Sequence, residues 1–337
     1  MRKIVLLFCF SLLTACEYKE LCYDHNHIFD VEVAFDWQLS PEADAAGMTV
    51  LFYNMDDPSI PYVRYDLGGM EGGKVKLAAG RYRALAFNND TETILYRGLE
   101  RIETIEAYTR NSSIEEGTQI TTRSQMPQTK AAEDEPVILE PDMLWGGASA
   151  EFTVKADGSI TNVNILLQQR VQEVTVTIRN VPNLQYASQF GGAISGLAPA
   201  VNMLTGERVV GKATQAFEVK VEDATTLKMS FLIIGPAVEV KDDPETPPEQ
   251  SEEPDTEAAD NHLTIYAVLA DGSQWYYSTE ISSQVPDPRT PEGEDTEIYI
   301  EVEDIPVPKP IVNGSGFQPT IDDWQSIEIP VGMPDND

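Results

Sequence analysis

The nine residues Phe29-Asp30-Val31-Glu32-Val33-Ala34-Phe35-Asp36-Trp37 decide the fold class. Their large apolar side chains fall on every second position, and three acidic side chains lie on positions between them. Successive side chains of a β-strand point to opposite faces of a sheet, so this period of two predicts a strand with one buried and one solvated face. The stretch therefore predicts a sheet that packs on one side only.

The same alternation recurs in short runs, and no long window has the i, i+3, i+4, i+7 pattern of an amphipathic helix. Short strands separated by Gly, Pro and Asp-Gly turns are typical of antiparallel sandwiches. The sequence thus predicts an all-β fold of two antiparallel β-sandwich domains. Besides 29–37, the predicted strands are 48–53, 62–67, 75–77, 82–88, 93–96, 101–105, 151–155, 160–167, 171–181, 216–221, 227–234, 263–269, 275–281, 297–302 and 324–331.

Three connections between these runs are predicted to be hairpin turns. They are Ala78-Ala79-Gly80, Asp157-Gly158 and Asp271-Gly272, and Asp-Gly favours tight hairpins because both residues tolerate positive φ. Residues 110–135 are predicted to form a polar surface excursion. Residues 184–203, rich in Gly, Ala and Ser, are predicted to form a long connection that contains a helical turn.

Composition and the Gly- and Pro-rich breaks between patterned runs divide the chain into four parts. A signal peptide over 1–15 and a lead over 16–28 precede a first sandwich over 29–147, which ends as Trp145 turns inward. The second sandwich covers 148–337. It is interrupted at 241–260 by a segment with nine carboxylates, one lysine and four prolines, which predicts a solvated loop. A calcium loop is the alternative for this segment, but the ordered ligand spacing is missing.

The N-terminus predicts a lipid anchor. A charged start, Met1-Arg2-Lys3, precedes an apolar run of ten residues at 4–13, which is too short for a membrane span of about 20 apolar residues. Leu13-Thr14-Ala15-Cys16 then fits the bacterial lipobox, in which the cysteine thiol is lipidated and the chain is cut before it. Acyl chains contribute about 0.8 kcal/mol per buried methylene, so they hold a folded domain on a bilayer. An ordinary signal peptide with Cys16 present by chance is the alternative.

Cysteines and charge narrow the function classes further. With Cys9 removed and Cys16 lipidated, Cys22 has no partner for a disulfide, so stability must come from core burial. The formal net charge is -33, or near -35 once the two basic residues of the signal are removed. Nucleic acid and anionic lipid head groups are poor partners for such a surface.

The first candidate site for chemistry lies in the lead. Asp24, His25 and His27 are possible metal ligands beside Cys22, although further ligands would have to come from distant positions such as His262. The alternative is a structured lead whose polar side chains form hydrogen bonds.

Catalytic motifs are missing from the sequence. There is no G-x-S-x-G elbow and no zincin motif, and three histidines leave little for a Ser-His-Asp triad. Acidic residues are abundant, so paired carboxylates for glycoside hydrolysis stay open, but nothing singles out one pair. We therefore predict a protein that is not an enzyme and that needs no cofactor.

The second candidate site is aromatic. Trp275 and Tyr276 lie on opposite faces of one predicted strand, so at least one of them is a candidate platform for stacking on a sugar ring. Cross-strand packing is the alternative.

Several short motifs together resemble the Bacteroidetes-type fimbrillin-like lipoproteins. They are the lipobox, Cys22-Tyr23-Asp24-His25 before the first strand, Gly80-Arg81-Tyr82 through Phe87-Asn88-Asn89-Asp90, and the closing Gly316-Phe317 with Asp322-Asp323-Trp324. Members of that group carry a domain of unknown function. The resemblance implies two transthyretin-like, Greek-key sandwiches and a place among the tip, shaft and anchor proteins of outer-membrane fimbriae.

One departure from the family favours an anchor over a shaft subunit. Shaft subunits of this kind lose their first strand to an Arg-specific protease, which opens a groove for a strand of the next subunit. Here no arginine lies between Cys16 and Arg64, and Lys19 is the one Lys or Arg in that interval. Cutting there would also separate the fold from its lipid.

These observations together predict a lipid-anchored, surface-exposed outer-membrane protein that acts in fimbrial assembly or adhesion as an anchor or accessory subunit. Its partners would be other fimbrial or surface proteins, with glycans as a further possibility, and no nucleic acid. A surface glycan-binding lipoprotein of a polysaccharide-utilisation system is the alternative. The segment predicted to pair with another subunit is the last strand, through Trp324, Ile327, Ile329 and Val331.

Overall fold

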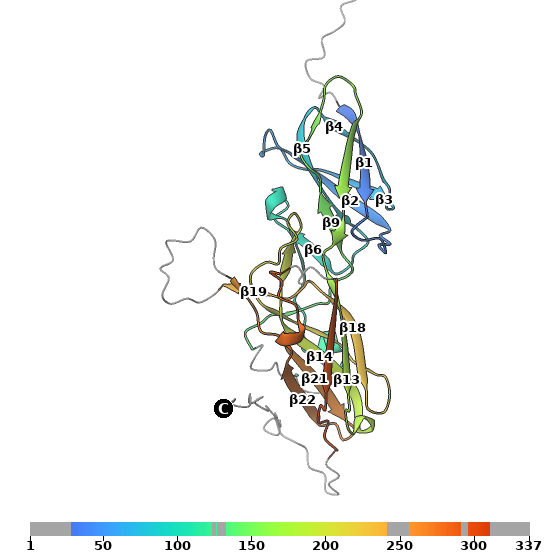
Figure 1. The fold of residues 1–337 in the computed structure, drawn as a ribbon, viewed down its shortest axis with the longest axis vertical. Coiled ribbons are helices and arrows are strands. Elements are labelled where there is room, and N and C mark those ends of the chain that lie inside the picture. Colours follow the sequence, from blue (N-terminus) through green and yellow to red (C-terminus); the bar gives the residue numbers. More distant parts are fainter. Residues whose placement is uncertain (1–27, 123–125, 127–132, 241–255, 291–295, 311–337) are drawn as a thin grey trace, which may run out of the picture.

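The computed structural model of the chain describes residues 28–122, 126, 133–240, 256–290 and 296–310. Its regular structure is almost entirely β-strand and forms two lobes stacked along the longest axis (Figure 1). The N-terminal lobe contains β1 to β5 and β9, and the C-terminal lobe contains β13, β14, β18, β21 and β22 (Figure 1). The predicted all-β class with two sandwiches is confirmed.

The N-terminal lobe pairs a three-stranded sheet with a six-stranded one. The smaller sheet has the order β11-β1-β4, and the larger has the order β12-β9-β5-β2-β3 with β10 also paired to β5. The strands are β1 (Ile28–Asp36), β2 (Gly47–Asn54), β3 (Val63–Gly68), β4 (Gly72–Ala78), β5 (Gly80–Asn88), β9 (Trp145–Ala148), β10 (Phe152–Val154), β11 (Thr161–Leu166) and β12 (Gln168–Gln169).

Strand β1 follows the pattern that its sequence predicts. Val31, Val33 and Phe35 are buried in the core of the sandwich, whereas Asp30 and Glu32 are exposed. The strand is central in its sheet, antiparallel to β4 and parallel to β11. Because burial of each large apolar side chain is worth roughly 1.5–3 kcal/mol, the alternation determines which face of β1 turns inward.

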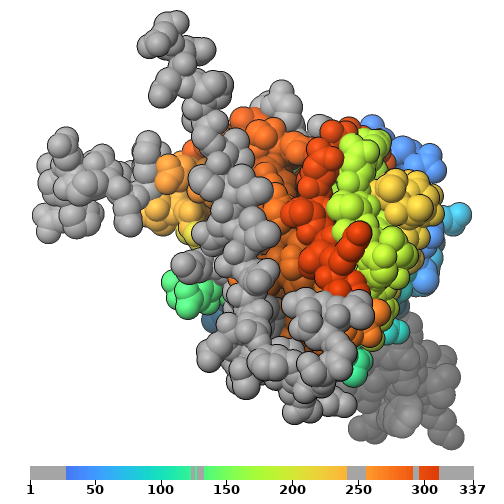
Figure 2. All heavy atoms as spheres, turned by 90° about the horizontal axis from the view of Figure 1, so that it is seen from below, coloured from blue at the N-terminus to red at the C-terminus, as the bar shows by residue number. Residues whose placement is uncertain are grey.

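The C-terminal lobe is a second sandwich. Its sheets have the orders β17-β18-β13-β23 and β22-β21-β14-β16-β8. Figure 2, which views the molecule from below Figure 1, shows β23 in red beside β13 in green, and the two strands pair in parallel. The strands are β8 (Val137–Ile138), β13 (Gln172–Arg179), β14 (Ala187–Leu197), β16 (Ala213–Glu218), β17 (Lys220–Val221), β18 (Leu227–Ile233), β21 (His262–Leu269), β22 (Gln274–Glu280) and β23 (Glu297–Glu303).

A buried apolar cluster joins the two lobes. Leu51 and Leu85, on the face of β2 and β5 that points away from the N-terminal core, pack with Val201 and Ile234 of the C-terminal half. The lobes therefore meet through a buried apolar cluster that is distinct from the core of either sandwich. The small elements of the fold are β6 (Ile94–Arg97), η1 (Ile102–Thr104), β7 (Glu106–Thr109), α2 (Ile114–Thr118), η3 (Leu184–Tyr186), β15 (Ala200–Asn202), β19 (Val238–Val240), β20 (Thr256–Ala258) and η4 (Ser282–Gln284).

The strand that spans the predicted boundary between residues 147 and 148 and the strand that follows it both belong to the N-terminal lobe. Strands β10, β11 and β12, within 152–169, complete the N-terminal lobe by pairing with β5, β1 and β9. Conversely, β8 precedes the predicted boundary but pairs with β16 of the C-terminal lobe. The chain thus crosses between the lobes more than once.

One of the three predicted hairpins is confirmed and two are wrong. Strands β21 and β22 pair antiparallel around Asp271-Gly272. At Ala78-Ala79-Gly80, however, β4 pairs with β1 and β5 pairs with β2, so the turn carries the chain from one sheet to the other. Asp157-Gly158 does the same between β10 and β11. A turn sequence sets a change of direction, whereas burial of one face selects the sheet that the next strand joins.

Residues 184–203 contain two strands, β14 and β15, where a long connection was predicted, although the helical turn is present as η3. Strand β14 lies inside the five-stranded sheet, between β21 and β16. A Cβ added at Gly192 would lie 2.3 Å from the ring of Phe217, and one added at Gly191 would lie 2.4 Å from Cβ of Thr118. Glycine is needed here for close packing, and its low strand propensity explains the wrong prediction.

Residues 110–135 also differ from the prediction of a surface excursion. Helix α2 packs against β14 and β16 and covers the outer face of the five-stranded sheet. The buried apolar side chains of this segment, which lie in one cluster with Tyr266, are Ile114, Ile120 and Met126. The predicted strand at 101–105 is instead the short 3-10 helix η1.

Candidate functional site

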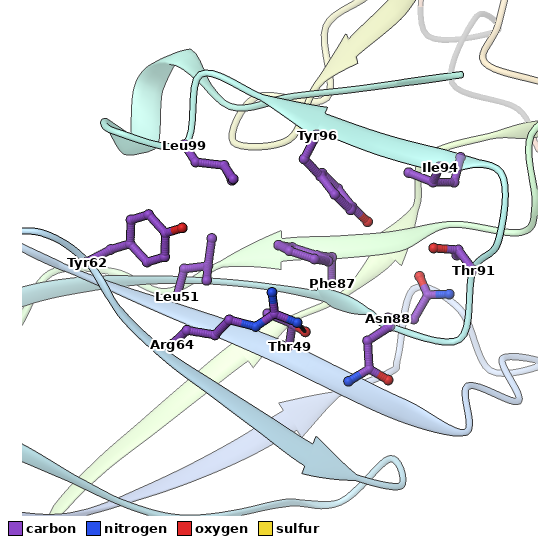
Figure 3. A pocket seen from close by; sticks show the side chains of 11 residues that line it. Thr49, Leu51, Tyr62, Arg64, Phe87, Asn88, Thr91, Ile94, Tyr96 and Leu99 are labelled. Carbon is purple, nitrogen blue, oxygen red and sulfur yellow. Dashed lines mark hydrogen bonds between the residues drawn. The ribbon is translucent and has the colours of Figure 1, made fainter. Parts of the chain in front are cut away.

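A pocket of about 200 Å³ lies beside the cluster that joins the lobes. Strands β2, β3 and β5 form one side of it, and β6 with the residues leading to η1 forms the other (Figure 3). The residues that line it are Thr49, Leu51, Tyr62, Arg64, Phe87, Asn88, Asn89, Thr91, Ile94, Tyr96 and Leu99.

Strand alternation builds the aromatic wall of the pocket. Strand β6 turns Ile94 and Tyr96 toward β5 (Figure 3). Leu95 and Arg97, at the alternate positions, are exposed. The ring of Tyr96 packs on that of Phe87, with centroids 4.3 Å apart and an angle of 31° between the planes. Figure 3 shows both rings in the middle of the pocket.

Arg64 lies at the rim of the pocket, and the carboxylate of Asp66 compensates its positive charge. Its Nε donates to Oδ1 of Asp66 at 3.0 Å, and the Thr49 hydroxyl donates to the same oxygen at 2.6 Å. The bond from Thr49, together with the guanidinium, holds the pKa of Asp66 below its usual range. Both charged side chains are more than half exposed (57% and 53%), so the ion pair contributes at most about 1 kcal/mol to stability. Its main effect is on the local charge.

Asn88 is a structural residue of the pocket. Its Nδ2 donates to the carbonyl of Met143 at 3.0 Å and to Asp90 at 2.7 Å, and its Oδ1 accepts from the amide of Trp145 at 2.8 Å. The side chain is 1% exposed. Its amide group therefore ties β5 to the segment entering β9, and these bonds leave it little capacity to bind a ligand.

Other polar groups of the pocket are available. Within the described residues, the hydroxyls of Tyr62 and Thr91 and Nη1 of Arg64 make no hydrogen bond. The Tyr96 hydroxyl is buried without a partner in the same part of the chain, and burial raises its pKa. The lining includes no carboxylate, histidine, serine or cysteine, so it offers contacts for a ligand but no acid–base pair.

Most residues predicted for a site lie outside the described residues. These are the lipidation residue Cys16, the metal candidates Asp24, His25 and His27, and the strand-exchange candidates Trp324, Ile327, Ile329 and Val331. In the described ranges, no group of three or more His, Cys, Asp or Glu residues is placed to hold a metal ion. No helix in those ranges is long and apolar enough to cross a membrane.

The aromatic platform predicted at Trp275 and Tyr276 is not formed. Trp275 is 6% exposed and stacks on Tyr277 in the C-terminal core, with centroids 6.3 Å apart. Tyr276 faces the other side of β22 and is half-buried, 6.2 Å from the ring of Tyr266. Packing within the sheet, the alternative weighed from the sequence, accounts for both residues.

Sequence reasoning did not find the pocket. Its residues come from β2, β3, β5, β6 and the connections that follow them, at no regular spacing. The run Phe87-Asn88-Asn89-Asp90 carries part of the family resemblance, and its polar residues at the end of a strand are the local sequence signal at this place.

The fold makes the chain a two-domain β-sandwich protein. Comparison with known proteins then identifies its family. A family model described as "Domain of unknown function (DUF5119)" matches residues 15–218. The chain belongs to this family, which confirms the resemblance to a group that carries a domain of unknown function.

A curated relative and two solved structures are similar to the chain. A candidate fimbrium anchoring subunit of Bacteroides ovatus, Fim4B, is 27% identical over 222 residues, which cover 65% of this chain and 61% of the relative. The chain thus matches less than two thirds of that relative's length. A candidate adhesin from Bacteroides ovatus has a TM-score of 0.57 at 21% identity, covering 84% of this chain and 94% of that one, so the two share a fold. The fimbrial anchor protein Mfa2 from Porphyromonas gingivalis has a TM-score of 0.49 at 13% identity, covering 82% and 90%.

Proposed function

We propose that the chain is a non-enzymatic subunit of the bacterial cell envelope that anchors or assists fimbriae, with a role in assembly or adhesion. The observation that carries the proposal is the similarity to Fim4B over 222 residues. That relative is a candidate fimbrium anchoring subunit, and the similar stretch covers 65% of this chain.

The position of β1 supports an anchor or accessory role over that of a processed shaft subunit. β1 lies between β4 and β11 and contributes Val31, Val33 and Phe35 to the core. Releasing it would expose these side chains and leave two strand edges unpaired. No arginine between Cys16 and Arg64 offers an Arg-specific protease a site for that release.

The proposed location is the outer membrane, with the protein exposed on the surface and held by lipid at Cys16. The lipobox supports this, and β1 begins only a short way along the chain from Cys16. The fold would then stand directly on the bilayer. Force on an attached fimbrium would pass through β1 and its two neighbouring strands to the lipid.

Pairing with a fimbrial partner is proposed to use the end of the chain. Within the segment from Trp324 to Val331, Ile327, Ile329 and Val331 occupy every second position, as in a strand that adds to a neighbouring sheet. Main-chain hydrogen bonds would supply affinity, and Ile327 and Ile329 would fix the register on one face.

A chromosomal deletion in a fimbriated host tests the proposal. Fimbriae should still be made, but the fraction of fimbrial protein in the culture medium should rise several-fold over the parent strain. The wild-type gene should restore attachment, and a Cys16→Ala gene should not. Unchanged amounts of fimbriae that remain attached to the deletion strain would overturn the proposal.

A further inference from the structure

The pocket beside the lobe junction presents free hydrogen-bond donors around an aromatic wall. Figure 3 shows Tyr62 at one end of the pocket, Thr91 at the other, and Arg64 along the side between them. The hydroxyls of Tyr62 and Thr91 and Nη1 of Arg64 have no partner within the described residues. A ligand that fits here therefore needs several polar groups spaced around one small body.

The size of the pocket limits that body to a single ring. Its volume is about 200 Å³. Pockets for drug-sized ligands are larger, from about 300 Å³ upward. One six-membered ring with its substituents fits this space, and a chain of rings would have to extend outward past the rim.

The side chains that line the pocket determine which kind of ring fits it. Leu99 and the partly exposed ring of Tyr96 offer apolar surface above the buried side chains of Leu51 and Phe87, which suits C–H groups, while the rim offers donors and acceptors. A purely aliphatic group would leave the rim without partners, and each polar group so buried costs about 1–3 kcal/mol. A ring with apolar faces and hydroxyls at its edge satisfies both parts.

Charge favours a neutral ring. Asp66 lies 3.0 Å from the guanidinium of Arg64, so the rim carries no uncompensated cation to attract an acid. The chain as a whole carries a formal charge of -33, which repels anions.

We infer that this pocket binds one neutral pyranose ring, the terminal unit of a glycan, between the aromatic pair Phe87–Tyr96 and the rim formed by Tyr62, Arg64 and Thr91. The site does not depend on the fimbrial role. A fimbrial anchor and a protein with another task at the cell surface would both be able to use it.

The test uses the full chain and a panel of methyl glycosides of glucose, galactose, mannose, fucose and N-acetylglucosamine, with methyl glucuronide as the acidic member. Saturation-transfer NMR at millimolar concentration detects binding. Tyr62→Phe removes one hydroxyl from the rim and should weaken binding about fivefold. Thr91→Trp should fill the pocket and abolish binding. Tyr299→Phe, which removes a hydroxyl from an exposed tyrosine of β23, is the matched control and should bind like the wild type.

The binding results distinguish a sugar site in this pocket from a site elsewhere or none. Binding of a neutral glycoside that is weakened by Tyr62→Phe, lost in a folded Thr91→Trp protein and unchanged in the control supports it. No binding of any neutral glycoside overturns it, as does binding of the glucuronide alone. Neutral binding that survives both pocket variants would place the site elsewhere and overturn the assignment equally. Thermal unfolding of each variant verifies that it is folded, and Tyr62→Ala replaces Thr91→Trp if the latter is not.

Discussion

Asn88→Ala should be among the most damaging single substitutions in the N-terminal lobe. The side chain is 1% exposed and serves two backbone groups, the carbonyl of Met143 at 3.0 Å and the amide of Trp145 at 2.8 Å. Alanine leaves both without their partner in a buried place, and each such group costs about 1–3 kcal/mol. We expect a total loss of about 3–5 kcal/mol, or a fall in Tm of roughly 6–20 °C at about 2–4 °C per kcal/mol.

The neighbouring residue supplies the control for this substitution. Asn89 is exposed, so Asn89→Ala should cost less than about 1 kcal/mol. Urea unfolding followed by tryptophan fluorescence reports on the site directly, because the backbone amide of Trp145 donates to Oδ1 of Asn88 and the Trp145 ring packs against Trp37 with centroids 6.2 Å apart. If the two variants unfold within about 1 kcal/mol of each other, the view of Asn88 as the link between β5 and β9 is wrong.

Four further outcomes are expected. Cys16→Ala should move the protein from the membrane fraction to the soluble fraction, and retention in the membrane would contradict the lipid anchor. Deletion of 324–331 should abolish capture of the fimbrial partner without changing the Tm, so intact capture would refute strand exchange at this segment. A broad panel of glycosides and esters should show no hydrolysis by the purified protein, and robust turnover would refute the non-enzymatic role. Burial raises the pKa of Glu140, so the folded state holds this proton more tightly than the unfolded chain and loses stability as pH rises through the raised pKa. Glu140→Gln, which keeps an acceptor for the amide of Leu232, should therefore stabilise the protein at neutral pH and change little below about pH 4; destabilisation at neutral pH would contradict this.

Strands with one wet face were predictable from the sequence. β1, β13 and β23 alternate cleanly because charged residues such as Glu32 and Glu301 mark the solvent side of each strand. The reason is local, since a period of two is visible within a few residues. Trp145, predicted to fold inward at the end of the first domain, is a core residue of the first lobe.

Which strands pair with each other was not predictable, because strand pairing depends on contacts between residues far apart in the sequence. The turn at 78–80 looks like a hairpin, yet the sandwich gains more from sending β4 and β5 to different sheets. β14 was missed since Gly191 and Gly192 are strand residues only where Thr118 and Phe217 press against them. The pocket was missed for the same reason, as its lining is assembled from separate segments.

Crosslinking on intact cells tests the central claim most directly. The protein would be captured after crosslinking in a fimbriated host, and the attached partners identified and quantified by mass spectrometry. We expect a fimbrial subunit to be the most abundant partner and to be lost when 324–331 is deleted. Capture of polysaccharide-uptake proteins with no fimbrial subunit would contradict the proposed fimbrial role and favour a surface glycan-binding lipoprotein.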